Sequence, residues 1–113
     1  MESQKKYKRA FSFEFFPPKT ADGISKLEAT SKLLAELHPR FFSVTFGAGG
    51  SARDRTYETV IDIREKSGIV AAPHLSCISS TEENIGHMLA ADFDAGVFRL
   101  VALRGDWPAG VVE

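Results

Sequence analysis

The sequence has one cysteine, almost no net charge and no long apolar segment. The single Cys77 cannot form an intramolecular disulfide, so the expected compartment is the cytoplasm. The 14 basic and 15 acidic side chains give a formal net charge of −1, which argues against a dedicated nucleic-acid binder. No apolar run approaches the roughly 20 residues of a membrane-spanning helix. We therefore expect a protein that binds neither nucleic acid nor membranes.

Two kinds of segment alternate along the sequence. Four short apolar runs, rich in aromatic or β-branched residues, predict buried strands at Ala10–Phe16, Phe41–Phe46, Ile69–His74 and Val97–Leu103. Between them, apolar residues at helical spacing predict three helices, at about 22–38, 53–66 and 81–94. Ser80 and Glu83 predict a capping box at the start of the third helix. This alternation is typical of parallel strands joined by right-handed crossovers.

The predicted units are nearly equal in length, which is typical of a (β/α)₈ TIM barrel. A complete barrel of this kind needs about 250 residues. The 113 residues supply about three βα units and a fourth strand. We therefore expect an α/β fold that is the truncated N-terminal part of a barrel, spanning residues 10–113, after a basic, disordered or frayed segment at residues 1–9. A small, complete open-sheet domain is the alternative.

Strand alternation places Glu14 on the face opposite to Phe11, Phe13 and Phe15, which a helix layer would cover. A carboxyl group among aromatic residues is poorly solvated, so we expect a raised pKa and a general acid that works near neutral pH. The alternative is a glutamate that points to solvent or pairs with a lysine such as Lys19.

Each of the other predicted strands also carries a polar residue near its C-terminal end. These residues are Thr45, His74 and Arg104. Barrel enzymes build their active sites at that end of the strands. His74 and Cys77 are too few ligands for a structural zinc site, so no metal is expected and His74 is interpreted as a neutral group beneath a planar ligand. For Arg104 and Asp106 the alternative is a surface ion pair of little energetic value.

Five ordered motifs lie between about Ser12 and Gly110. They are SFEFFPPK at 12–19, SVTFGAGG at 43–50, RDRT at 53–56, APHLSC at 72–77 and VALRGD at 101–106. Together they resemble the methylenetetrahydrofolate reductase family. The resemblance implies a (β/α)₈ barrel that binds FAD non-covalently, takes a hydride from NADH or NADPH, and reduces 5,10-methylenetetrahydrofolate to 5-methyltetrahydrofolate. It also implies a homo-oligomeric flavoprotein oxidoreductase of one-carbon metabolism and methionine biosynthesis.

The resemblance further implies a role for each matching residue. Glu14 matches the family's general acid, which helps to open the five-membered ring of the folate. Thr45 matches a position near the nicotinamide and the flavin, and Phe46, Ala48 and His74 match flavin contacts. Arg104, Gly105 and Asp106 match the site beside the flavin, where Asp106 also reaches the folate as a catalytic and substrate-binding residue.

The sequence departs from the family's pattern. Phe46 stands where some members carry tyrosine, so a phenol hydrogen bond is lost there. The family's remaining flavin and folate contacts lie on later strands and helices. The alternative function is therefore a catalytically silent barrel fragment that only self-associates or binds ligand weakly.

Overall fold

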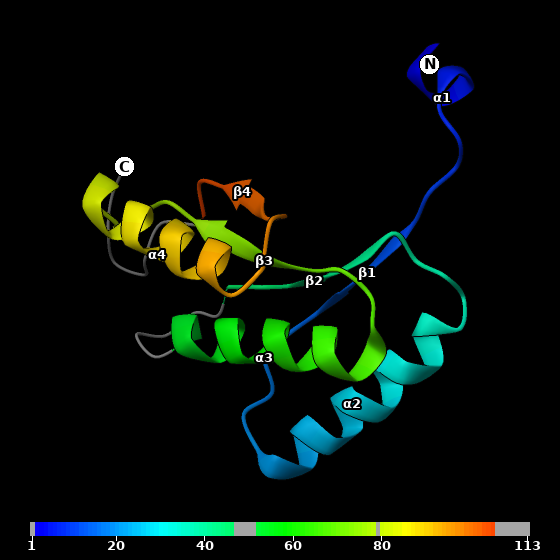
Figure 1. The fold of residues 1–113 in the computed structure, drawn as a ribbon, viewed down its shortest axis with the longest axis horizontal. Helices are drawn as coiled ribbons and strands as arrows, with labels where there is room; N and C mark the ends of the chain where they lie inside the picture. Colours follow the sequence, from blue (N-terminus) through cyan, green and yellow to red (C-terminus); the bar gives the residue numbers. More distant parts are fainter. Residues whose placement is uncertain (1, 47–51, 79, 106–113) are drawn as a thin grey trace.

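The computed structural model describes residues 2–46, 52–78 and 80–105, in which strands and helices alternate (Figure 1). In chain order the elements are α1 (Glu2–Lys6), β1 (Ser12–Phe15), α2 (Ala21–Ala35), β2 (Phe41–Val44), α3 (Ala52–Ser67), β3 (Ala71–Ser76), α4 (Glu82–Asp94) and β4 (Val101–Leu103). The strands form one sheet in the order β1-β2-β3-β4, and every neighbouring pair is parallel. The predicted α/β class, element order and parallel pairing are confirmed.

Helices α2, α3 and α4 follow one another along one face of the sheet (Figure 1). The core lies between that face and the helices, and its fully buried side chains include Phe42, Val44, Val60 and Ile63. The rings of Phe13 and Phe15 pack on Phe42 at centroid distances of 6.2 and 5.2 Å. These two phenylalanines therefore face the helices as strand alternation predicted.

The helix layer is less complete than the apolar pattern predicted. Phe11 is 48 % exposed, and two apolar residues in the C-terminal part of α4, Leu89 and Phe93, are also exposed. In α2 the fully buried residue is Ser31, whose hydroxyl group donates to the Glu28 carbonyl oxygen at 3.0 Å. A hydrogen bond within the helix thus lets a polar residue occupy a core position.

Two helix ends differ from the prediction. Helix α2 ends at Ala35, three residues early, because His38 adopts a φ of 55° and Pro39 disfavours a helical residue before it. At α4 the predicted capping box of Ser80 and Glu83 is wrong by one residue. Thr81 is the N-cap, and its Oγ1 accepts a hydrogen bond from the backbone N–H of Asn84 at 3.1 Å. Serine and threonine both suit an N-cap, so composition did not separate the two positions.

The third and fourth strands begin later than predicted, at Ala71 and Val101. The backbone N–H of Cys77 donates to the Leu103 carbonyl oxygen at 3.0 Å. Four residues earlier in this parallel ladder the donor would be the N–H of residue 73 and the acceptor the Arg99 carbonyl oxygen, but residue 73 is Pro73, which has no N–H to donate. The pairing of β3 with β4 therefore starts only at His74 and Val101.

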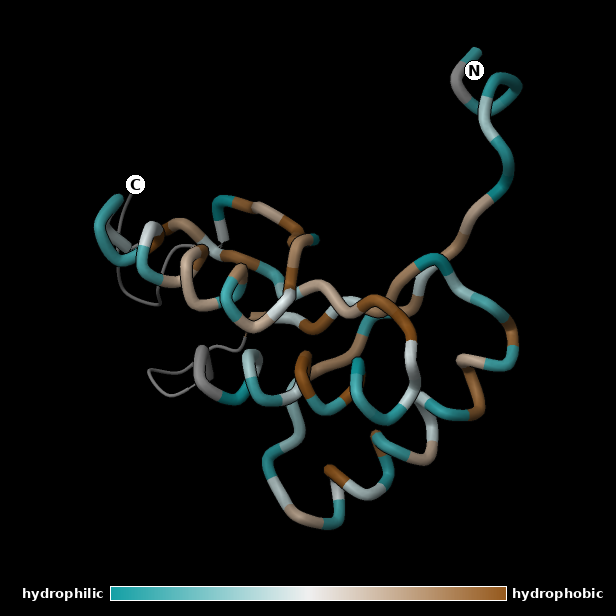
Figure 2. The backbone as a smooth tube through the Cα atoms, in the orientation of Figure 1, coloured by the Kyte–Doolittle hydropathy of each residue, from teal (hydrophilic) through white to brown (hydrophobic). Residues whose placement is uncertain are grey.

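The N-terminal segment, predicted to be frayed, contains the short helix α1, which stands away from the sheet (Figures 1 and 2). It is hydrophilic, with Glu2 in its first turn and Lys5 and Lys6 in its last, an order that suits the helix dipole. Among the described helices, none is both long and apolar enough to cross a membrane.

Candidate functional site

Three neighbouring strands bring Glu14, Ser43 and His74 into contact. Glu14 Oε1 lies 3.0 Å from His74 Nε2, and Ser43 Oγ lies 3.3 Å from the same nitrogen. Glu14 is directly opposite Ser43 in the β1–β2 register, and parallel partners project from the same face. These residues, here called the Glu14 cluster, therefore lie on the sheet face opposite to Phe13 and Phe15.

The side chains of the Glu14 cluster differ in exposure. Ser43 is 4 % exposed, whereas the side chains of His74 and Glu14 are 12 % and 56 % exposed. The expectation of a carboxyl group enclosed by aromatic rings is wrong for the described residues, because the neighbouring phenylalanines turn to the helix side. Of the alternative, the exposure of Glu14 to solvent is confirmed, whereas pairing with Lys19 is wrong because the carboxylate contacts His74.

The geometry of the Glu14 cluster excludes a hydrolytic Ser-His-acid triad. In such a triad, serine and carboxylate bind different ring nitrogens of the histidine. Here Ser43 and Glu14 both approach Nε2. The arrangement instead gives an accessible carboxyl group that is held from one side by a mostly buried imidazole. Such a group can exchange a proton with a molecule bound on this face of the sheet.

Thr45 follows β2 on the same face. Its backbone N–H donates to the Phe15 carbonyl oxygen at 2.9 Å, and its own carbonyl oxygen accepts from Thr56 Oγ1, also at 2.9 Å. Its hydroxyl oxygen is buried and has no hydrogen-bond partner within the described part of the chain. Buried polar atoms normally have a partner, so this hydroxyl group suits a polar atom of a bound cofactor.

His74 and Phe46 also border a cavity of about 340 Å³, but Pro73 and Leu75 line it too, so it lies on the helix side of the sheet and not on the face of the Glu14 cluster. Thr56 and Tyr57 of α3 and Met88 of α4 contribute to its wall. A larger cavity, of about 790 Å³, lies between α2 and α3, but none of the predicted site residues lines it. We therefore assign the candidate site to the ends of β2 and β3 on the face of the Glu14 cluster, and to neither cavity.

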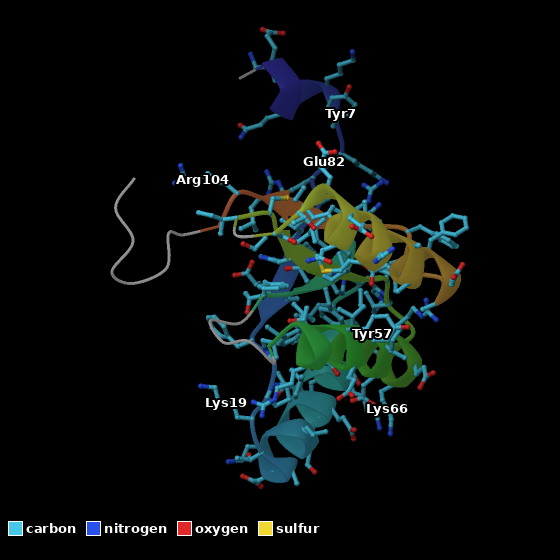
Figure 3. All side chains as sticks on the ribbon, turned by 90° about the vertical axis from the view of Figure 1, so that its left-hand side faces the viewer. Tyr7, Lys19, Tyr57, Lys66, Glu82 and Arg104 are labelled. Atoms are coloured by element: carbon cyan, nitrogen blue, oxygen red, sulfur yellow. The ribbon has the colours of Figure 1, made fainter. Side chains whose placement is uncertain are left out.

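The fourth strand contributes less to the site than predicted. The β3–β4 register places Val101 and Leu103 on the face of the Glu14 cluster. Arg104, which follows Leu103, is therefore not on the same face as His74 by strand alternation. Arg104 is exposed, its Nε donates to the Gly105 carbonyl oxygen at 3.4 Å, and Figure 3 shows it well apart from Lys19. Ala48 and Asp106 lie outside the described residues.

Sequence reasoning missed Ser43 and Thr56 as site residues. Ser43 alternates with Thr45 on the strand, and that alternation was the available signal for it. Thr56 belongs to the quoted RDRT motif, but its bond to Thr45 spans 11 residues and follows no local rule. Across residues 2–46, 52–78 and 80–105, no group of three or more His, Cys, Asp or Glu side chains could hold a metal ion.

Comparison with known proteins agrees with the motifs. The methylenetetrahydrofolate reductase family model matches residues 1–112. The chain is 43% identical over 97 residues to a 5,10-methylenetetrahydrofolate reductase of Pectobacterium carotovorum subsp. carotovorum, covering 86% of this chain and 33% of that protein. It is 41% identical over 99 residues to the protein of that name from Escherichia coli (strain K12), covering 88% and 33%.

A plant protein is also similar. The chain is 41% identical over 101 residues to "Methylenetetrahydrofolate reductase (NADH) 1" of Arabidopsis thaliana, covering 89% of this chain and 17% of that protein. The chain thus spans about a third of the length of its bacterial relatives. The family match covers nearly all 113 residues and includes every segment of the candidate site. The chain therefore belongs to the methylenetetrahydrofolate reductase family.

Proposed function

We propose that this chain carries the proton donor of an enzyme that reduces 5,10-methylenetetrahydrofolate to 5-methyltetrahydrofolate. The contact between Glu14 and His74 on the sheet face away from the helices is the observation that carries the proposal. The family membership and the names of the relatives support the same reaction. The hydride donor is NADH or NADPH, and the Arabidopsis thaliana relative is named as an NADH enzyme.

The site residues suit FAD as the cofactor. When bound, FAD supplies the hydride-transfer chemistry that amino-acid side chains lack. The Thr45 hydroxyl group, which has no hydrogen-bond partner within the described part of the chain, would hold part of it on the face of the Glu14 cluster. The family motif assigns further contacts to Ala48, Arg104, Gly105 and Asp106. The carboxylate of Asp106 would also favour a cationic, ring-opened folate.

Glu14 supplies a proton to a nitrogen of the folate's five-membered ring, which weakens the bond that must open. The carboxylate left behind accepts a hydrogen bond from His74 Nε2, which is already 3.0 Å away. Ser43, 4 % exposed, contacts the same ring nitrogen and limits the movement of the imidazole. The carboxylate therefore stays in place and can be protonated again from the solvent that reaches its exposed side.

The larger setting is also part of the proposal. The parallel alternation of strands and helices and the one-third coverage of the relatives support an N-terminal part of a (β/α)₈ barrel. We place the protein in the cytoplasm, as a homo-oligomer that serves one-carbon metabolism and methionine biosynthesis.

The test is Glu14→Gln in a full-length version of the enzyme, followed by stopped-flow spectroscopy. Glutamine keeps the size of the side chain but cannot release a proton. We expect flavin reduction by NADH or NADPH at a near-normal rate, and a folate step slowed by about 10²–10⁴-fold, the usual contribution of general acid catalysis.

Glu28→Gln is the matched control, because Glu28 lies on α2 and pairs only loosely with Lys66 at 3.8 Å. It should leave both half-reactions unchanged. Equal losses in the two half-reactions of Glu14→Gln would make Glu14 a structural or flavin-positioning residue. An unchanged folate step would remove it from the mechanism.

A further inference from the structure

The hydrogen bond between Thr56 and Thr45 joins the beginning of α3 to the end of β2. We infer that Thr56 is a positioning residue that fixes Thr45 for its contact with the cofactor and the nicotinamide. The inference rests on the proposed function, because it assigns Thr45 to that reaction. Thr56 is 3 % exposed, and its Oγ1 donates to the Thr45 carbonyl oxygen at 2.9 Å.

The sheet itself cannot supply this hydrogen bond. In a parallel ladder, the N–H of a residue donates to one residue of the neighbouring strand. Its carbonyl oxygen accepts from the residue two positions further along that neighbouring strand. Thr45 donates to Phe15, so its carbonyl oxygen should accept from residue 17. Residue 17 is Pro17, which has no N–H. The hydroxyl group of Thr56 takes the place of the missing donor.

The hydrogen bond from Thr56 also restricts the Thr45 side chain. The N–H and the carbonyl oxygen of Thr45 are both bonded, to Phe15 on one strand and to Thr56 on a helix. The backbone is therefore held by two separate elements. A β-branched residue has few rotamers once its backbone is fixed. Together with Phe15, Thr56 thus sets the direction of the buried Thr45 hydroxyl group, which has no hydrogen-bond partner within the described part of the chain.

The test compares Thr56→Val, which removes the hydroxyl group and keeps the shape, with Thr56→Ser, which keeps the hydroxyl group. The matched control is Thr59→Val, since Thr59 is also buried but its Oγ1 donates to the Arg55 carbonyl oxygen within α3. All are made in a full-length version of the enzyme. Thr56→Ala replaces Thr56→Val if valine prevents folding.

Kinetics give the first readout. We expect Thr56→Val to slow flavin reduction by NADH or NADPH by about 10- to 100-fold, the scale of a small misplacement of a reacting group. The proton-dependent folate step should change much less, which is the reverse of Glu14→Gln. Thr56→Ser should restore most of the rate, and Thr59→Val should match the wild type. Equal effects of Thr56→Val and Thr59→Val would overturn the inference.

Nuclear magnetic resonance gives the second readout. This measurement uses the 113-residue chain, in which the dipeptide Thr-Phe occurs once, at 45–46, so that carbonyl-¹³C threonine with ¹⁵N phenylalanine selects the Thr45 carbonyl signal. Thr56→Val should shift this signal, and Thr56→Ser should return it. An unmoved signal would overturn the inference by itself. A wild-type enzyme without folate reduction would overturn the proposed function, while the carbonyl signal would still decide whether Thr56 holds Thr45.

Discussion

At the scale of single residues, the partner of Glu14 determines what its carboxyl group can do. A lysine ammonium group only donates hydrogen bonds, so it holds a carboxylate and disfavours the protonated acid. A histidine ring nitrogen either donates or accepts, depending on the tautomer. His74 can therefore hold Glu14 before and after it gives up its proton. This property suits a group that must be protonated again in every catalytic cycle.

Gly105 offers a test of backbone geometry at the same scale. Its φ is 89°, and a Cβ atom there would collide with Ser76 Oγ and approach Ile78 Cγ2 to 2.9 Å. We expect Gly105→Ala to lower the free energy of unfolding by about 1–3 kcal/mol. The alanine would have to adopt a positive φ, and its Cβ atom would displace the neighbouring side chains. Urea denaturation of the 113-residue chain measures this change.

Gly86 is the matched control for Gly105. It lies within α4, and a Cβ atom there would meet no atom within 4 Å. Gly86→Ala should raise the free energy of unfolding by about 0.4–1 kcal/mol, since alanine restricts the unfolded chain. The two glycine variants should thus differ in sign. A neutral Gly105→Ala would contradict the close packing of Gly105 on β3.

At the scale of elements, sequence patterns predicted which segments are strands and helices but not how neighbouring elements meet. Apolar periodicity is local, and it gave the order and class of the elements correctly. Register and capping depend on single backbone donors. Pro73 delays the start of β4, and Thr81 rather than Ser80 caps α4.

The same distinction explains what was predictable in the candidate site. Alternation along β1 placed Glu14 on the face away from Phe13 and Phe15. Its contact with His74 reaches across β2 and depends on both strand registers, which no local pattern contains. The bond from Thr56 to Thr45 is of the same long-range kind. The side chains could therefore be named from motifs, but their contacts could not.

The N-cap of α4 gives the test at this scale. Thr81→Ala removes the oxygen that accepts from the Asn84 N–H, and we expect it to lower the free energy of unfolding by about 1 kcal/mol. Ser80→Ala is the control, and it should stay within about 0.5 kcal/mol of the wild type. Thermal and urea denaturation measure both. A larger loss of unfolding free energy for Ser80→Ala than for Thr81→Ala would support the capping box predicted at Ser80.

At the scale of the whole molecule, the chain exposes more surface than its mass requires. Its accessible surface is 8113 Å². A compact monomer of 12.4 kDa would expose about 6,100 Å². The radius of gyration of 15.3 Å also exceeds the roughly 13 Å of a compact chain of this length. Part of the excess belongs to α1, which stands away from the sheet (Figure 2).

The strands account for another part of the exposed surface. Phe16, which follows β1, is 78 % exposed, and Leu103 of the edge strand β4 is 37 % exposed. Exposed apolar strand edges recruit other chains. We therefore expect the 113-residue chain to form a dimer or a larger species in light-scattering measurements, increasingly so at higher concentration.

A charge placed on the edge strand should reverse this association. Leu103→Lys puts a cation on β4, next to unpaired backbone groups, and lysine on an edge is a usual means of preventing strand pairing. We expect this variant to shift the population towards monomer. Leu33→Lys is the control, because Leu33 is 66 % exposed on α2, away from the strand edge, and it should leave the assembly unchanged. A wild-type chain that stays monomeric at high concentration and melts cooperatively would contradict the prediction and indicate a self-sufficient small domain. Equal dissociation by both lysines would place the contact outside the edge strand.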